Sequence, residues 1–231
     1  MIISHSHKFI FLKTEKTAGT AIEAALSELC GPFDVITPFR GTSEKDRRGR
    51  SPQNYRIEHP GKPPRPLWRK LMLRPERYYH PSVGYYEHIP ASRVRMYLGE
   101  ETWRNYFKFA FVRNAWDRQV SQYLYKTKSK KRKPTFQKFM ARKKAAYVMS
   151  YEIYTIEETV VVDFIGRYES LDQDLAKALE CVGIKQKLFL PHTNVTPNRK
   201  LGSYREYYSP HTQDLVSSWY ASEIALWGYA F

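Results

Sequence analysis

Short apolar runs and stretches of helical spacing alternate along this chain. Residues 8–13 (KFIFLK) form a continuous apolar run, which is typical of a strand buried on both faces. From Ala18 the apolar spacing becomes helical, and we expect the helix to end near the CGP sequence at residues 30–32. The apolar positions of this helix are Ile22, Ala25, Leu26 and Leu29. The pattern therefore predicts a strand, a tight turn and a helix in succession.

Two further segments repeat this order of strand and helix. In residues 106–125 an alternating apolar stretch precedes Asn114, a residue suited to cap a helix, and an apolar face follows. That face consists of Trp116, Val120, Tyr123 and Leu124. In the third segment the run from Val160 to Ile165 predicts a buried strand. The helix expected behind it carries Leu171, Leu175, Ala178, Leu179 and Val182.

Strands that alternate with helices favour an α/β fold in which a central parallel sheet is flanked by helices. Ligands in such folds bind at the carboxyl ends of the strands. Near the end of the chain, Ser209 and Pro210 suit the start of a last helix. Its apolar stripe, expected in the core, is Leu215, Val216, Trp219 and Tyr220.

The length of 231 residues suits one domain spanning residues 1–231. Seven of the 14 prolines fall between Pro52 and Pro81, so we interpret residues 40–81 as a Pro- and Arg-rich insertion or extended loop. A basic tract at residues 126–144 contains ten Lys or Arg residues and no acidic residue. Its role and that of the insertion stay open at this point.

The charge balance predicts a protein that attracts anions, because the formal net charge is +15. Nucleic acid, an anionic glycan, a membrane surface and a phosphorylated cofactor all remain compatible with it. No apolar run approaches the roughly 18 to 20 residues of a membrane span, and the first residues lack the order of a signal peptide, so we expect a cytoplasmic protein. Cys30 and Cys181 are expected to be reduced, buried thiols.

The turn after the first strand is suited to hold an anion. A turn that enters a helix directs several backbone N–H groups and the positive helix end at one place. Lys16 adds a charge, Thr17 and Thr20 add hydroxyl groups, and Gly19 permits close approach of the backbone. The turn lacks the spacing GxxxxGK[ST] of the common nucleotide loop, which favours a smaller terminal group than a triphosphate.

A second group of polar residues follows the second strand, in the sequence FVRNAWDRQVSQY. Arg113 stands at the expected end of that strand and Ser121 lies two turns into the next helix. Together they could bind a second phosphate. The alternative for Arg113 is a surface ion pair with Asp117.

With both motifs in view, the chain resembles the sulfotransferases that use 3′-phosphoadenosine 5′-phosphosulfate (PAPS), and most closely the carbohydrate branch in its bacterial form. The resemblance covers nearly the whole chain except the middle of the insertion and the basic tract. Its segments are KTAGT, CGPFDVITP, SPQNY, HIPASRVRMYLGEETWRNYFKF, FVRNAWDRQVSQY, DFIGRYESL and YREYYSPHTQDLVSSWYASEIALWGYAF.

The resemblance implies a fold related to nucleotide kinases, with a phosphosulfate-binding loop after the first strand. The residues matching this loop are Lys16, Thr17, Ala18, Gly19, Thr20 and Ala21. The 3′-phosphate site of the family matches Arg113 and Ser121, and a basic loop near the end matches Arg199 and Lys200. Ala21 departs from a common serine, and Ala115 departs from a common proline. Glu15 places a negative charge beside the expected anion, and we expect its side chain to point away.

The reaction implied is in-line transfer of a sulfuryl group to a hydroxyl acceptor, expected to be a carbohydrate; an anionic glycan is one candidate. Lys16 would stabilise charge on the leaving oxygen, and a histidine would take the proton of the acceptor. His88 matches the usual position of that histidine, with His80 as the second candidate. No metal is expected. The alternatives are a nucleotide kinase, a nucleic-acid-binding protein or an inactive member of the family.

Overall fold

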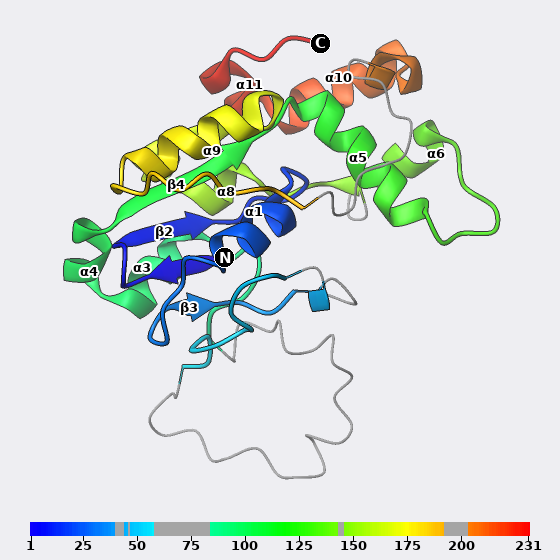
Figure 1. Ribbon diagram of the computed structural model, residues 1–231. Helices are drawn as coiled ribbons and strands as arrows, with labels where there is room; N and C mark the ends of the chain where they lie inside the picture. Colours follow the sequence, from blue (N-terminus) through cyan, green and yellow to red (C-terminus); the bar gives the residue numbers. More distant parts are fainter. Residues whose placement is uncertain (40–43, 46, 58–83, 143–145, 192–202) are drawn as a thin grey trace, which may run out of the picture.

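The computed structural model describes residues 1–39, 44–45, 47–57, 84–142, 146–191 and 203–231 (Figure 1). Its main feature is a five-stranded sheet in which β2, β4 and β7 are parallel neighbours, while β1 pairs antiparallel with both β2 and β3. In spatial order the strands are β3 (Val35–Ile36), β1 (Ile2–Ser4), β2 (Phe9–Leu12), β4 (Phe107–Val112) and β7 (Phe164–Arg167). The expected α/β fold with a mostly parallel central sheet is confirmed.

Helices cover both faces of this sheet (Figure 1). The helices near the sheet are α1 (Gly19–Leu26), α3 (Ala91–Leu98), α4 (Glu100–Asn105), α8 (Tyr151–Tyr154) and α9 (Leu171–Glu180). Apolar residues of α1 and α9 form one core with alternate residues of β2 and β4, and residues of α3, α4 and α8 form a second core on the opposite face. Because successive strand residues point to opposite faces, the continuous apolar runs of β2 and β4 are buried on both sides.

The remaining helices form a third cluster of apolar residues beside the sheet. These helices are α5 (Ala115–Thr127), α6 (Phe136–Met140), α10 (Pro210–Trp219) and α11 (Ala221–Trp227), with the short 3₁₀ turn η4 (Ser203–Tyr207). A second 3₁₀ turn, η3 (Tyr168–Ser170), follows β7. The expected caps are present: Asn114 accepts hydrogen bonds from the first turn of α5, and Ser209 forms a capping box with Thr212 at the start of α10. A fully buried ion pair between Arg118 and Glu223 joins α5 to α11.

The strand predicted at Val160–Ile165 is displaced in the structure. Thr159–Val160 is β6, which pairs with β5 (Thr155–Ile156) in a separate hairpin, and the strand of the main sheet begins only at Phe164. The reason is Asp163, whose carboxylate accepts the N–H of Lys108 at 2.7 Å and whose own N–H donates to the Lys108 carbonyl at 2.8 Å. The valines before it pack on the second core without entering the sheet.

Parts of the predicted insertion and basic tract belong to the folded body. Residues 47–57 pack beside β3, where Gln53 pairs with Ile36, and Arg50 donates to the Cys30 carbonyl at 2.8 Å. Most of the basic tract lies in α5, α6 and their connection. In the described part of the chain, no helix has the length and apolar character needed to cross a membrane.

The two cysteines differ from each other. Cys30 is a buried free thiol, as expected, and burial raises its pKa to about 12. Cys181, at the end of α9, is free but exposed, so the expectation of a buried thiol is wrong there. The residue follows the last helical turn, and its neighbours Val182 and Ile184 are the ones that pack on the first core.

Candidate functional site

The two motifs singled out in the sequence meet at the carboxyl edge of the parallel strands. The turn after β2 is fastened to β4 by Thr14, whose hydroxyl donates to the Phe111 carbonyl. Arg113, just after β4, donates from its guanidinium to the Lys16 carbonyl at 2.9 Å. The residues predicted to bind two phosphates therefore share one site.

The backbone of residues 16–20 is shaped to bind an anion. Lys16 and Ala18 both have positive φ, at 64° and 61°, on either side of Thr17. Alternation of this kind turns successive N–H groups toward one concave site. The first intrahelical bond is from Ala21 to Ala18, so earlier N–H groups of α1 have no partner within the helix. This arrangement suits the terminal oxyanion of a phosphosulfate.

Gly19 and Thr17 have structural roles in the loop that the sequence did not reveal. A Cβ on Gly19 would lie 2.6 Å from Lys13 Cγ, so the glycine is required by the lysine packed against it. Its φ is not positive; Ala18 is the residue in the left-handed region. Thr17 is buried, and its hydroxyl bonds to Thr14 within the loop, whereas Thr20 is partly exposed.

Lys16 lies against α5 and carries a perturbed ammonium group. Its Nζ lies 4.1 Å from the centre of the Tyr125 ring, and Lys128 approaches the same ring at 4.8 Å. Burial, followed by the positive charge of Arg113, lowers the pKa of Lys16 to about 8, although Glu15 raises it. The negative charge of Glu15 thus favours the protonated form of Lys16. That the Glu15 side chain points away from the bound anion stays a prediction.

Arg113 is buried and held from three sides. Its Nε donates to Asp117 Oδ2 at 2.6 Å, and its guanidinium lies 3.7 Å from the centre of the Tyr168 ring. The ion pair with Asp117 thus exists, but it is buried beside the loop and not on the surface. Ser121 lies one turn further along α5 than Asp117 and is partly exposed. Of the two residues predicted to bind the second phosphate, Arg113 contacts the turn after β2, and Ser121 lies on the same face of α5 as Asp117.

His88 is hydrogen-bonded to the residue that follows β2. Its Nδ1 lies 2.8 Å from the Lys13 carbonyl oxygen. Because a carbonyl can only accept a hydrogen bond, Nδ1 carries the proton, and Nε2 is the basic nitrogen of the neutral ring. The other predicted site residues, His80, Arg199 and Lys200, lie outside the described residues.

Sequence reasoning missed three charged residues behind the loop. Lys13, Glu23 and Glu87 are buried together, and the Lys13 ammonium forms ion pairs with both carboxylates. The available signal was a glutamate inside the apolar helix sequence AIEAAL and a lysine at the end of a buried strand. Buried charges at such positions require partners.

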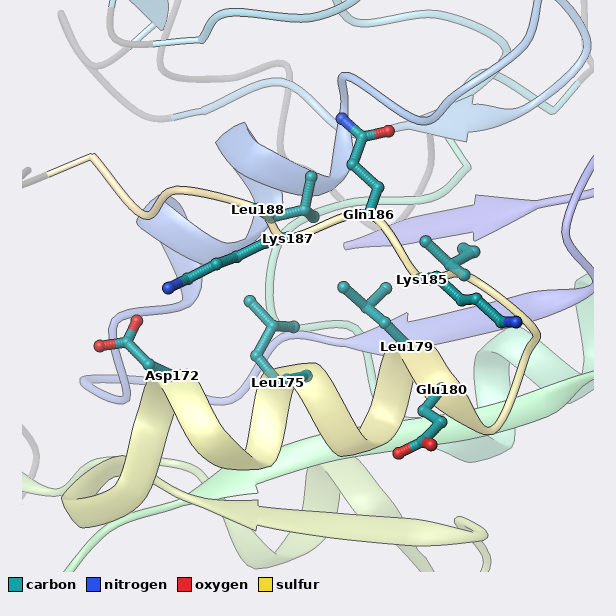
Figure 2. A pocket seen from close by; sticks show the side chains of 10 residues that line it. Asp172, Leu175, Leu179, Glu180, Lys185, Gln186, Lys187 and Leu188 are labelled. Atoms are coloured by element: carbon teal, nitrogen blue, oxygen red, sulfur yellow. The ribbon is translucent and has the colours of Figure 1, made fainter.

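A surface groove lies away from these residues, between α9 and the chain that follows it (Figure 2). Leu175 and Leu179 of α9 face Leu188 across a space of about 390 Å³, and lysine and acidic side chains stand at both ends. None of the predicted site residues that the structure describes lines it. Within the described residues, no group of three or more His, Cys, Asp or Glu side chains is placed to hold a metal ion.

Comparison with known proteins decides the family. A family model described as the sulfotransferase family matches residues 1–230. The chain belongs to the sulfotransferase family. A protein of Archaeoglobus fulgidus described as uncharacterized is 34% identical over 104 residues, which cover 43% of this chain and 87% of that protein. A crystal structure of a sulfotransferase from Alicyclobacillus acidocaldarius aligns over 97% of this chain and 96% of its own, with 14% identity and a TM-score of 0.46.

This sulfotransferase is accordingly an enzyme that transfers a sulfuryl group from a sulfate donor to an acceptor. The nucleotide kinase considered from the sequence is set aside by the family match. The loop after β2, with its backbone N–H groups and Lys16, lies where the sequence placed the anion-binding turn.

Proposed function

We propose that the enzyme transfers the sulfuryl group of PAPS to a hydroxyl group of a carbohydrate, with His88 as general base. The observation that carries the proposal is the convergence of three groups at one edge of the sheet. Arg113 donates to the Lys16 carbonyl at 2.9 Å, and His88 donates to the Lys13 carbonyl at 2.8 Å. Arg113 and His88 are thus both hydrogen-bonded to the segment between Lys13 and Lys16, which supports a shared site.

The donor half of the site would hold two phosphate groups. The N–H groups of residues 17–20 and the Lys16 ammonium would contact the 5′-phosphosulfate, and Arg113 with Ser121 would contact the 3′-phosphate. Arginine suits this role because its planar guanidinium can donate several hydrogen bonds to one phosphate. Arg113 is already oriented by Asp117 and Tyr168, which reduces the entropy lost on binding.

The acceptor half would use His88 as the base. PAPS supplies the sulfuryl group and a leaving adenosine 3′,5′-bisphosphate. His88 Nε2 would take the proton of the acceptor hydroxyl as its oxygen bonds to sulfur, and Lys16 would stabilise negative charge on the departing phosphate oxygen. The hydrogen bond from Nδ1 to the Lys13 carbonyl favours this role because it fixes the tautomer.

An anionic carbohydrate is the acceptor class that the charges favour. The basic tract begins beside the site: Lys128 shares the Tyr125 ring with Lys16, and Lys126 and Lys128 both lower the pKa of Lys16. A row of positive charge at the reacting group would attract and orient a negatively charged chain.

The test is transfer of radiolabelled sulfate from PAPS to a panel of neutral glycans, anionic glycans and phenols. We expect transfer to glycans, faster to the anionic ones at low salt. Lys16→Ala and Arg113→Ala should weaken binding of adenosine 3′,5′-bisphosphate. His88→Asn, which keeps a hydrogen-bond donor near the position of Nδ1, should retain that binding and lose ~10²- to 10⁴-fold in turnover.

His211→Asn is the matched control, because His211 is exposed on α10 and should have no effect. Undetectable binding of the bisphosphate to the wild-type protein would refute the donor assignment. Wild-type turnover in His88→Asn would refute the assignment of His88 as general base. Transfer to phenols alone would refute the proposal of a carbohydrate acceptor.

A further inference from the structure

Lys13 connects the two halves of the candidate site. It follows β2 directly and its side chain is 2% exposed. The geometry points to Lys13 as a positioning residue, which together with Glu23 and Glu87 fixes the anion-binding loop and His88 relative to each other. This inference rests on the proposed function, since it takes His88 as the base.

Toward the loop, Lys13 holds helix α1. Its Nζ lies 3.0 Å from Oε2 of Glu23, which is fully buried in α1. Its methylene chain fills the space beside Gly19, where a Cβ would come within 2.6 Å of Cγ. Glu23 is further fixed by the Thr37 hydroxyl, which donates to Oε1 at 2.9 Å. The start of α1, which presents the N–H groups to the donor, is thus seated on this lysine.

Toward the base, Lys13 makes two contacts with adjacent residues. Its ammonium pairs with Glu87, and its carbonyl oxygen accepts the hydrogen bond from His88 Nδ1 at 2.8 Å. His88 has a φ of 56°, a conformation that non-glycine residues adopt only when the surroundings enforce it. The ion pair fixes Glu87, the residue before His88, and the hydrogen bond fixes the His88 ring. Together these contacts hold the His88 backbone in its unfavourable conformation.

The ionisation of Lys13 and Glu23 agrees with a role in holding the site in place. Burial alone would lower the pKa of Lys13, but Glu23 and Glu87 outweigh it and raise the pKa above its ordinary value. The pKa of Glu23 is in turn lowered: burial opposes this shift, and the positive charges of Lys13, the N-terminal amine and Arg47 together overcome it. Lys13 and Glu23 therefore stay ionised at neutral pH. A buried ion pair often contributes little net stability, so orientation is the role that the geometry favours.

Two isosteric substitutions test the two sides of the lysine separately. Glu87→Gln removes the charge beside His88, and we expect turnover to fall about tenfold while the Kd of adenosine 3′,5′-bisphosphate stays within about twofold. Glu23→Gln removes the charge on α1. We expect it to raise the Kd of adenosine 3′,5′-bisphosphate and to leave turnover nearly unchanged. Glu87→Asp keeps the charge but is one methylene shorter; it should lower turnover with the unfolding midpoint retained.

A double-mutant cycle identifies the route of the effect. If Glu87 acts through His88, Glu87→Gln should slow the wild type about tenfold and the His88→Asn variant less than twofold. An equal loss in both backgrounds, or unchanged turnover in Glu87→Gln and Glu87→Asp, would overturn the inference while leaving the proposed function intact. Wild-type turnover in His88→Asn alone would instead refute the base, and with it the route through Glu87.

Discussion

Replacing Lys16 by arginine separates the charge of this side chain from its titration. Burial and the nearby Arg113 lower the pKa of Lys16 to about 8, so the side chain is mostly protonated at pH 7 and mostly neutral at pH 9. An arginine stays charged over this whole range. A bound phosphosulfate or phosphate would favour the charged form of the lysine.

The magnitude follows from the fraction of protein that carries the charge. If the bound anion returns the pKa to its ordinary value of about 10.4, affinity for adenosine 3′,5′-bisphosphate falls about tenfold between pH 7 and pH 9, or about 1.4 kcal/mol. Binding at pH 9 should take up about 0.9 proton. Phosphate groups ionise near pH 6, so measurements from pH 7.5 upward isolate the lysine.

The assay is calorimetric titration with the bisphosphate at several pH values, each in two buffers of different ionisation enthalpy. The wild type should show weaker binding and proton uptake as the pH rises through 8. Lys16→Arg should bind with little change between pH 7.5 and 9 and take up almost no proton. Equal pH dependence in the two proteins would refute the reasoning.

Three further outcomes are expected. Arg113→Ala should weaken binding of adenosine 3′,5′-bisphosphate ~10- to 100-fold but leave binding of adenosine 5′-phosphate unaffected, because only the former has a 3′-phosphate. Equal losses of affinity for both nucleotides, measured by calorimetry, would show that Arg113 does not bind the 3′-phosphate. Gly19→Ala should lower the free energy of unfolding by ~1–3 kcal/mol in urea, since its Cβ would overlap the Lys13 chain, and an unchanged midpoint would contradict that packing. Glu223→Gln should cost ~3–5 kcal/mol in the same assay, because it leaves the Arg118 charge buried without its partner; a loss under about 1 kcal/mol would show that water reaches the arginine.

The first two strand–helix units were readable from local pattern. A strand buried on both faces needs a continuous apolar run, and a helix packed on it needs apolar spacing of 3.6 residues, so β2, α1, β4 and α5 followed from the sequence. Asn114 and Ser209 cap helices as their side chains predicted. The third strand was misplaced because an apolar run looks the same whether its residues pair in a sheet or only pack against a core. The contacts of Asp163 with β4 decided where the strand begins.

What the sequence by itself determined is therefore two strand–helix units, the helix caps and the residue types at the strand ends. Tertiary structure decided which of these residues meet: Arg113 with the Lys16 carbonyl, and His88 with the Lys13 carbonyl, across separations of 97 and 75 residues. It also decided that Gly19 is needed for the buried Lys13 chain, a reason that no local pattern contains. The physical cause is the same in each case, because a buried charge or a close backbone approach depends on partners that only folding brings within a few ångströms.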